Sequence, residues 1–283
     1  CYMNSVCQAL SHTDPIVDFF LSGEYEQDIN TENFLGYKGK AAGAFATLVK
    51  TIWSGDTKVF KPSEIKKQAG VMNELFKGYS QQDAQELLIT LLDGLHEDLN
   101  RVRGKKPYHE KRDINPQVME QFQNGEERLA AEEWYHHLKR DRSFAVDLFQ
   151  GQLRSVVCCS KCPNYSVCFD PFMYLVMPLR DDKDEMSLHE CFENFSSGSK
   201  LTGDEQWYCD VCKKKVDAVQ YLSVYKYPPL LMIMLKRFSK RSSKKITTKV
   251  DIVDAKKHYG NKGDTPNYRL YAAIDHIGRN IRS

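Results

Sequence analysis

The sequence lacks long runs of apolar residues and shows no large excess of charge of either sign. No stretch approaches the ~20 apolar residues that a helix needs to cross a bilayer. Forty Lys and Arg residues against 38 Asp and Glu residues leave a formal net charge of +2. This balance gives no support to a nucleic-acid or membrane partner bound mainly by bulk charge. A secretory hydrophobic segment is also missing, but a chain that opens on Cys1 is expected to have lost its true N-terminus.

Internal repeats and low-complexity tracts are absent as well. With 283 residues, 41% of them hydrophobic and 28% charged, the chain is typical of a globular protein with one large domain or two ordinary ones. Its nine cysteines are an odd number and cannot all pair. Two C-x-x-C units favour metal or redox chemistry over a disulfide scaffold. We therefore expect a reducing, intracellular setting, in the cytoplasm or the nucleus.

The first half of the chain is predicted to be mostly helical. Apolar spacing over 1–12 predicts an amphipathic helix that starts at or just after Cys1. The clearest helix is expected over 78–102, with Ser80 as N-cap, Asp83 at capping-box spacing and a stripe of core residues over 84–99. Residues 103–143 are charged, and we interpret them as a surface excursion that ends in a helix.

From residue 148 onward the pattern predicts strands. Five segments are rich in β-branched, aromatic and aliphatic residues: LFQGQLRSVV, FMYLVMPL, VQYLSVYKY, LLMIMLKRF and YRLYAAIDH. Helices followed by strands, without βαβ alternation, predict an α+β fold.

Two cysteine turns, CCSKC (158–162) and CDVC (209–212), form the most specific metal signal. Cys159, Cys162, Cys209 and Cys212 have the number and spacing of the ligands of tetrahedral zinc. Four protein ligands leave no open position, so the predicted zinc is structural. The alternatives are a redox dithiol or unrelated thiols.

The first cysteine is a candidate nucleophile. A thiol at a helix N-terminus meets unpaired N–H groups and the positive end of the helix dipole, which favour the thiolate form. Most such cysteines are inert, and Cys7, on the apolar face, is expected to be one of the core residues. A thiol protease also needs a distant base. Among eight histidines we select His276, at the end of a predicted strand beside Gly278, and interpret five others as solvated surface residues: His96, His109, His136, His137 and His258.

Taken together, five segments resemble the ubiquitin-specific processing proteases, papain-like cysteine peptidases that remove ubiquitin, over essentially the whole chain. CYMNSVCQAL resembles their cysteine box from the nucleophile onward, GYSQQDAQELL the glutamine–aspartate box, and YRLYAAIDHIG the histidine box. The paired cysteine turns match the zinc site of the fingers, and FDPFMYLVMPL and LLMIMLKRF resemble palm strands. LLDGLHEDLNR further resembles the subgroup whose parents carry a DUSP domain and a ubiquitin-like domain.

This resemblance implies a papain-like α+β fold with a helical thumb, a β-sheet palm and zinc-clipped β fingers. A single catalytic domain over 1–283, truncated at both ends, would contain the thumb over 1–145, the fingers over 146–225 and the palm over 226–283. The basic segment KRFSKRSSKK (236–245) would border a mobile loop over the substrate channel or be a plain solvated loop.

The resemblance also implies the chemistry. Cys1 would be the nucleophile and His276 its base in thiol-dependent hydrolysis of the bond after ubiquitin's C-terminal glycine. Ubiquitin and ubiquitinated proteins would be the partners, and structural zinc the only cofactor. The implied contacts to ubiquitin's basic tail are Gln82, Asp83 and Glu86, although Asp83 is equally suited to cap a helix.

The sequence departs from the family pattern at both ends. The family's cysteine box begins before the nucleophile with an asparagine of the oxyanion hole, and its histidine box continues to an Asp or Asn that orients the base. Neither has a counterpart here, so we expect residues 1–283 alone to be weakly active or inactive. Two other readings remain open: a ubiquitin-binding pseudoenzyme, and a zinc-ribbon scaffold for nucleic acid or protein.

Overall fold

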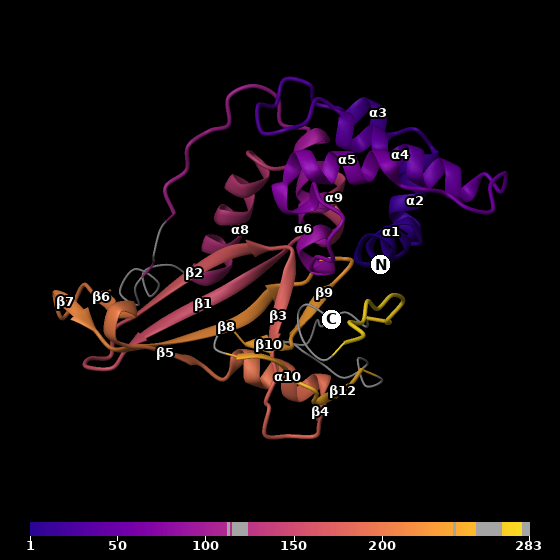
Figure 1. Cartoon of the computed structure of the whole chain (residues 1–283). Helices are drawn as coiled ribbons and strands as arrows, with labels where there is room; N and C mark the ends of the chain where they lie inside the picture. The colour runs from indigo at the N-terminus through magenta and orange to yellow at the C-terminus, as the bar shows by residue number, and fades with distance from the viewer. Residues whose placement is uncertain (112–113, 115–123, 240–241, 253–267, 279–283) are drawn as a thin grey trace.

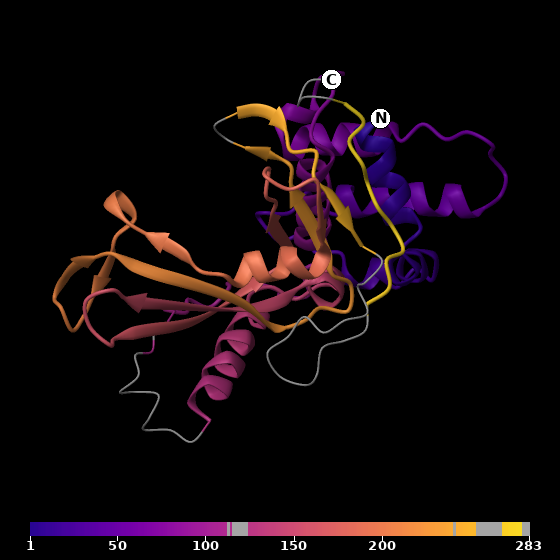
Figure 2. The ribbon, with the colours of Figure 1, turned by 90° about the horizontal axis from the view of Figure 1, so that it is seen from below.

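A computed structural model describes residues 1–111, 114, 124–239, 242–252 and 268–278. One end of the molecule is a block of helices, and a long sheet extends away from it (Figures 1 and 2). This mixture of helices and mainly antiparallel strands confirms the predicted α+β class. The helices of the block are α1 (Tyr2–Ser11), α2 (Asp14–Leu21), α3 (Tyr25–Asp28), α4 (Lys40–Trp53), α5 (Ser63–Met72), the 3-10 turn η1 (Glu74–Phe76), α6 (Ala84–Asp98) and α9 (Phe144–Phe149).

Helix α6 is the centre of the helical block. Its predicted leucine stripe is confirmed, because α1, α4, α5 and α9 pack around it and leave the following side chains at most 2% exposed: Leu87, Leu91, Leu92, Leu95 and Leu99. The predicted N-cap was wrong. Asp83, not Ser80, caps the helix, and its carboxylate accepts hydrogen bonds from the backbone N–H groups of Gln85 (2.7 Å) and Glu86 (3.4 Å).

The extended sheet has four strands in the order β2-β1-β8-β5, all antiparallel. The predicted strand at 148–157 starts later than expected, because residues up to Phe149 belong to α9. Gly151 opens β1 where a side chain would collide with the Lys226 carbonyl and the Phe172 ring. The strands are β1 (Gly151–Cys159), β2 (Tyr165–Phe172), β5 (Ser199–Leu201) and β8 (Ala218–Lys226), with the hairpin β6 (Trp207–Cys209) and β7 (Lys214–Val216) at the far end (Figure 1).

A smaller unit with its own core connects the sheet to the helices. Strands β3 and β9 pair in parallel, as do β4 and β12. Helix α10 covers them, and its capping box joins Ser187 and Glu190. The elements of this unit are β3 (Tyr174–Pro178), β4 (Glu185–Ser187), α10 (Leu188–Ser196), β9 (Met232–Lys236) and β12 (Lys249–Asp251). A short hairpin, β10 (Phe238–Ser239) with β11 (Ser242–Lys245), follows β9. Residues 240–241 of the basic segment lie outside the described residues.

The predicted surface excursion over 103–143 contributes to a core. Its helix α8 (Gly125–Leu138) lies against the sheet, where Leu129 and Ala130 are buried with Val167 and Phe169. Ala130 also accepts a hydrogen bond from the Gln152 side chain (2.9 Å). The excursion therefore supports the sheet instead of lying free on the surface. Within the described ranges, every helix is too short or too polar to span a membrane.

The expectation that the five histidines are solvated was wrong for His96. That ring is 7% exposed, and its Nδ1 lies 2.8 Å from the Ser143 hydroxyl. His109 and His137 are half-buried and contact Glu133 (3.0 Å) and Gln150 (2.6 Å). His258 lies outside the described residues.

Asp141, in the loop after α8, contacts His96 of α6. Its carboxylate accepts a hydrogen bond from Lys106 (2.9 Å) and lies 3.5 Å from His96 Nε2. Burial on its own raises the pKa of Asp141, but hydrogen bonds from His96 and Lys106 outweigh burial and hold it well below its usual range. The stability that this carboxylate contributes is therefore present above the unfolded-state pKa of about 3.9 and lost as the pH falls toward the folded-state pKa.

We expect Asp141→Asn to lower the free energy of unfolding at pH 7 by about 1–3 kcal/mol, since a charged acceptor is lost from a mostly buried site. The difference from the unsubstituted chain should shrink below about pH 4. Urea unfolding at the two pH values measures both effects, with the exposed Asp56→Asn as the charge-matched control. An equal difference at both pH values would contradict this assignment.

Candidate functional site

The candidate nucleophile sits at the start of the first helix. Cys1 is the N-cap residue of α1, and its side chain is exposed. Its Sγ lies 3.1 Å from Gln81 Oε1, and its backbone nitrogen lies 3.5 Å from the same oxygen. No acidic side chain occupies the first turn of α1. The thiol therefore faces solvent beside the positive end of a helix dipole, a position that favours a reactive thiolate.

Cys7 shows the opposite environment on the same helix. It is 4% exposed in the helical core, and burial raises the pKa of its thiol to about 12. A thiol with this pKa remains protonated at neutral pH and is a poor nucleophile. The prediction that Cys7 is a core residue is confirmed.

Gln81 is a site residue that the sequence analysis missed. It lies on the loop between η1 and α6, and Lys66 fixes that loop by donating to the carbonyls of Phe76 (2.5 Å) and Gly78. Tyr2, the first residue of α1, stacks on Phe76 with 6.1 Å between ring centroids. These contacts set the loop against the start of α1. The only sequence signal for Gln81 was its membership of the QQDAQE box.

The three predicted tail-binding residues lie just beyond Gln81. Asp83 and Glu86 are exposed, while Gln82 is half-buried. Asp83 caps α6, so its alternative role as a helix cap is confirmed. Glu86 accepts a hydrogen bond from the Asn73 side chain (3.3 Å). Both carboxylates remain accessible at the amino end of α6, just after the loop whose Gln81 contacts Cys1.

The candidate base lies on an extended segment, not on the strand that was predicted. Residues 268–278 have no assigned strand among the described residues. Side chains attach the segment instead: Tyr268 donates to the Pro228 carbonyl, and the Tyr271 hydroxyl lies 3.1 Å from Thr13 Oγ1. Since Thr13 directly precedes α2, this contact brings the segment beside the N-terminal helices (Figures 1 and 2).

His276 itself is half-buried and incompletely satisfied. Its ring meets the Phe238 ring edge-to-face at 5.5 Å, and its carbonyl accepts a hydrogen bond from Lys245. Its Nδ1 is buried without a hydrogen-bond partner among the described residues. The Cys1 thiol contacts Gln81, and the described residues contain no hydrogen bond between Cys1 and His276. The imidazole is thus positioned by packing, with one nitrogen lacking an orienting partner.

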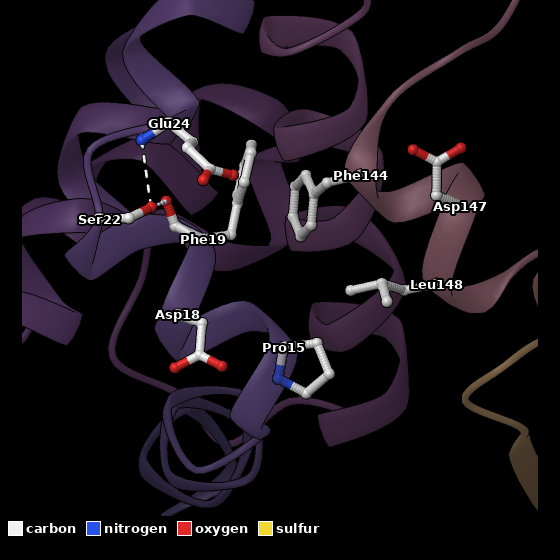
Figure 3. Close-up of a pocket in the computed structure, with 8 residues that line it drawn as sticks. All are labelled: Pro15, Asp18, Phe19, Ser22, Glu24, Phe144, Asp147 and Leu148. Atoms are coloured by element: carbon white, nitrogen blue, oxygen red, sulfur yellow. Dashed lines mark hydrogen bonds between the residues drawn. The ribbon is translucent and has the colours of Figure 1, made fainter.

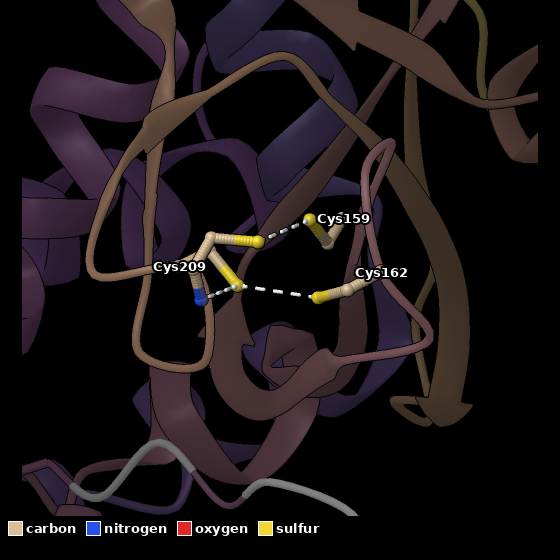
Figure 4. Close-up of side chains that lie close together, drawn as sticks. Cys159, Cys162 and Cys209 are labelled. Atoms are coloured by element: carbon tan, nitrogen blue, oxygen red, sulfur yellow. Dashed lines mark hydrogen bonds between the residues drawn. The ribbon is translucent and has the colours of Figure 1, made fainter.

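The four predicted zinc ligands converge in space. Figure 4 shows three of them, Cys159, Cys162 and Cys209, with their sulfur atoms pointing toward one another. Their sulfur atoms all lie within 4.8 Å of one another, with Cys159–Cys212 at 4.0 Å and Cys162–Cys209 at 3.6 Å. Tetrahedral zinc with Zn–S bonds of about 2.3 Å places its sulfurs about 3.8 Å apart. The cluster therefore fits zinc in ligand type, number and spacing.

The surroundings of Cys209 suit a thiolate. Burial on its own raises the pKa of Cys209, but N–H donors from Cys212, Asn164 and Val211 outweigh burial and lower it to about 6. The side-chain amide of Asn164 lies 3.5 Å from Cys209 Sγ. N–H groups that point at the sulfur of a metal-ligating cysteine are typical of protein metal sites.

A second group of potential ligands lies inside the helical block. Ligand atoms of His96, Glu97 and Asp141 are also within 4.8 Å of one another. The ammonium group of Lys106 lies 2.9 Å from Asp141 and 3.6 Å from Glu97. Lys106 already supplies the positive charge that this group needs, so we assign it a structural role.

Comparisons with known proteins agree with the fold and the candidate site. All of residues 1–283 match the protein family described as "Ubiquitin carboxyl-terminal hydrolase". The chain belongs to this family. Ubiquitin carboxyl-terminal hydrolase 4 of Pongo abelii is 48% identical over 188 residues, which cover 66% of this chain and 18% of that protein. Ubiquitin carboxyl-terminal hydrolase 15 of Homo sapiens is 44% identical over 184 residues, 65% of this chain and 18% of that protein.

The solved structures support the fold. The chain resembles a chain in the structure of the SAGA Ubp8/Sgf11/Sus1/Sgf73 DUB module bound to ubiquitin aldehyde, with a TM-score of 0.59 and 21% identity. The match covers 89% of this chain and 49% of that one. The predicted family fold is confirmed, and hydrolases 4 and 15 agree with the predicted subgroup. The chain spans less than one fifth of the length of these curated relatives.

Proposed function

We propose that this chain is the catalytic part of a thiol-dependent deubiquitinase, with Cys1 as nucleophile and His276 as base. The observation that carries the proposal is the exposed thiol at the amino end of α1, in contact with Gln81. The segment that bears His276 contacts the same helical block through Tyr271 and Thr13. Family membership supports the reaction class, and the ubiquitin aldehyde bound to the Ubp8 module supports ubiquitin as the ligand. Free cysteines throughout the described chain agree with a reducing location in the cytoplasm or nucleus.

The reaction would proceed in two steps. His276 takes the proton of the Cys1 thiol, and the thiolate attacks the carbonyl carbon of ubiquitin's terminal glycine. The tetrahedral oxyanion collapses, the bond to the lysine or main-chain amine breaks, and the imidazolium returns its proton to that amine. Water, deprotonated by His276, then attacks the thioester and releases ubiquitin from Cys1.

We propose a thumb over 1–145, fingers over 146–225 and a palm over 226–283, with the thiol on the thumb and the base on the palm. Zinc held by Cys159, Cys162, Cys209 and Cys212 would join the turn after β1 to the β6–β7 hairpin. The metal would lie at the opposite end of the sheet from Cys1 (Figure 1), so it would contribute to folding and not to the reaction.

Residues 1–283 by themselves are proposed to be a weak hydrolase. A catalytic imidazole needs a partner on Nδ1 to hold the tautomer whose Nε2 accepts the proton, and losing that partner costs about 10⁴ in rate in a serine protease. Among the described residues Nδ1 of His276 has no hydrogen-bond partner, which supports a deficit of this kind. A kcat/KM for residues 1–283 within the usual enzyme range of about 10⁴–10⁸ M⁻¹s⁻¹ would contradict it.

A ubiquitin-binding pseudoenzyme is the second candidate. The contact of the thiol with Gln81 in place of His276 favours it. The two candidates differ in the release of aminomethylcoumarin from ubiquitin-aminomethylcoumarin by the zinc-loaded protein. The deubiquitinase releases coumarin and is stopped by N-ethylmaleimide. Ubiquitin binding without release, under the same conditions, would support the pseudoenzyme.

Asp83 offers a test of tail recognition that separates charge from capping. Asn caps helices about as well as Asp, whereas Ala does not. We expect Asp83→Asn to keep the stability of the protein but raise KM for ubiquitin-aminomethylcoumarin about tenfold or more, since a charge-assisted contact is lost. Asp83→Ala should show the same rise and also lose about 1 kcal/mol of stability. An unchanged KM in Asp83→Asn would leave Asp83 as a helix cap alone.

A further inference from the structure

A cavity of about 320 Å³ lies between α2 and α9, on the helical block (Figure 3). Its floor is aromatic: Phe19 and Phe144 stack with 4.9 Å between ring centroids and 21° between ring planes. Pro15 and Leu148 add apolar surface to the wall of the cavity. None of the candidate catalytic, tail-binding or zinc residues lines it, so the cavity is separate from the site described above.

The rim of this cavity carries only negative charge. Asp18, Glu24 and Asp147 line it, and no lysine, arginine or histidine does. Arg101 lies 2.6 Å from Asp147, but it also pairs with Asp28 and carries one positive charge for both carboxylates. The exposed carboxylates of Asp18 and Glu24 have no ion pair or hydrogen bond among the described residues. Two free carboxylates therefore stand at the edge of an aromatic floor.

The surrounding sequence has the same bias. The chain as a whole is nearly neutral, at +2, yet its first basic residue other than histidine is Lys38. Two acids on the neighbouring turn have cationic partners: Glu26 lies 3.7 Å from Lys50, and Asp28 lies 2.7 Å from Arg101. Asp18 and Glu24 at the cavity have no such partner among the described residues. The acidic residues before Lys38 are Asp14, Asp18, Glu24, Glu26, Asp28 and Glu32.

We propose that this cavity is a docking site for a Lys or Arg side chain from an extended basic segment of a partner protein. The aliphatic stem would lie on Phe19, Phe144 and Leu148, and the cationic head would reach Asp18 and Glu24. Long cationic side chains bury their stems on apolar surface and are attracted to aromatic rings as well as to carboxylates. The volume is at the low end for ligand pockets and suits one or two side chains. Phosphate-rich partners are repelled by this rim.

The test uses a fluorescein-labelled peptide, Gly-Leu-Lys-Arg-Lys-Leu-Gly, whose anisotropy is measured with the zinc-loaded protein. Binding should be specific to the basic residues and weaken as salt is added. We expect the double variant Asp18→Asn with Glu24→Gln to bind at least about tenfold more weakly, because both charge-assisted contacts are lost. The control Asp56→Asn with Glu205→Gln removes the same charge from exposed sites elsewhere.

Amide NMR shifts caused by the peptide locate its site, and they should concentrate in α2 and α9. Hydrolysis of ubiquitin-aminomethylcoumarin should be the same in both double variants, since neither changes a site residue. The proposal is overturned if the peptide does not bind the unsubstituted protein at millimolar concentration. It is also overturned if the cavity variant binds as tightly as the control, if a peptide with glutamine at the three basic positions binds equally well, or if the shifts lie elsewhere.

Discussion

Replacing Cys1 by alanine is expected to reduce ubiquitin-aminomethylcoumarin hydrolysis by at least about 10⁴-fold. Removing the nucleophile of a covalent mechanism removes the whole reaction path, and such losses in proteases are among the largest known for single substitutions. Ubiquitin affinity should change little, because alanine keeps the start of α1 and removes only the sulfur. Coumarin fluorescence gives the rate, and titration of labelled ubiquitin gives the affinity.

Cys7→Ala is the matched control for this experiment. It removes a thiol from the same helix, but one that is buried and has a pKa of about 12. It should cost stability through the cavity it leaves and retain most of the activity at temperatures where the protein stays folded. Activity that survives in Cys1→Ala, or that disappears equally in a folded Cys7→Ala, would contradict the assignment of the nucleophile.

Removing the zinc is expected to have the largest effect on stability. Four thiolates brought this close repel one another without a metal, and structural zinc in small domains contributes most of the folding free energy. Cys209→Ser should reduce bound zinc from one ion per chain to none. A loss of several kcal/mol corresponds to a drop in Tm of roughly 10 °C or more for a chain of this size. Elemental analysis and thermal unfolding measure the two effects.

Cys168→Ser provides the comparison, because Cys168 lies on β2 in the same sheet and outside the four-sulfur cluster. It should keep one zinc and nearly the original Tm. A Cys209→Ser protein with its zinc and its Tm intact would show that the cluster does not hold the metal. A chelator should reproduce the effect of Cys209→Ser in the unsubstituted protein but add nothing to the variant.

Local sequence patterns predicted a helix or strand well where the periodicity of that one segment determines its structure. The leucine stripe of α6 and the strand β8 follow from periodicity within one segment. The cap of α6 did not follow, because Ser80 and Asp83 are both good capping residues. The preceding loop is held by Lys66 and Tyr2 from other helices, and these contacts are absent from the local pattern.

The predictions for the histidines failed for the same reason, because a local pattern does not contain tertiary contacts. His96 stands in a charged stretch and was expected to face water, but Ser143 and Asp141 supply buried polar partners from a segment far along the chain. The segment that carries His276 has the composition of a strand but no assigned strand among the described residues, and its contacts are made mainly through side chains. Both outcomes depend on tertiary neighbours that a local pattern does not contain.

The candidate site likewise contains some residues that the sequence predicts and others that it does not. The zinc ligands were predictable because each turn contains its own spacing, and the four sulfurs meet as the spacing indicates. Gln81 was not, because its role depends on the approach of the η1–α6 loop to Cys1. The acidic cavity between α2 and α9 also joins residues that are distant in sequence.

The most direct test of the account is to react the protein with ubiquitin bearing a C-terminal propargylamide and to locate the adduct by mass spectrometry. The method requires a reactive thiol aligned with ubiquitin's C-terminus, and it detects even a slow enzyme. The account predicts one ubiquitin per chain, attached through Cys1 and absent in Cys1→Ala. Attachment to another cysteine, or binding of ubiquitin with no adduct at Cys1, would contradict it.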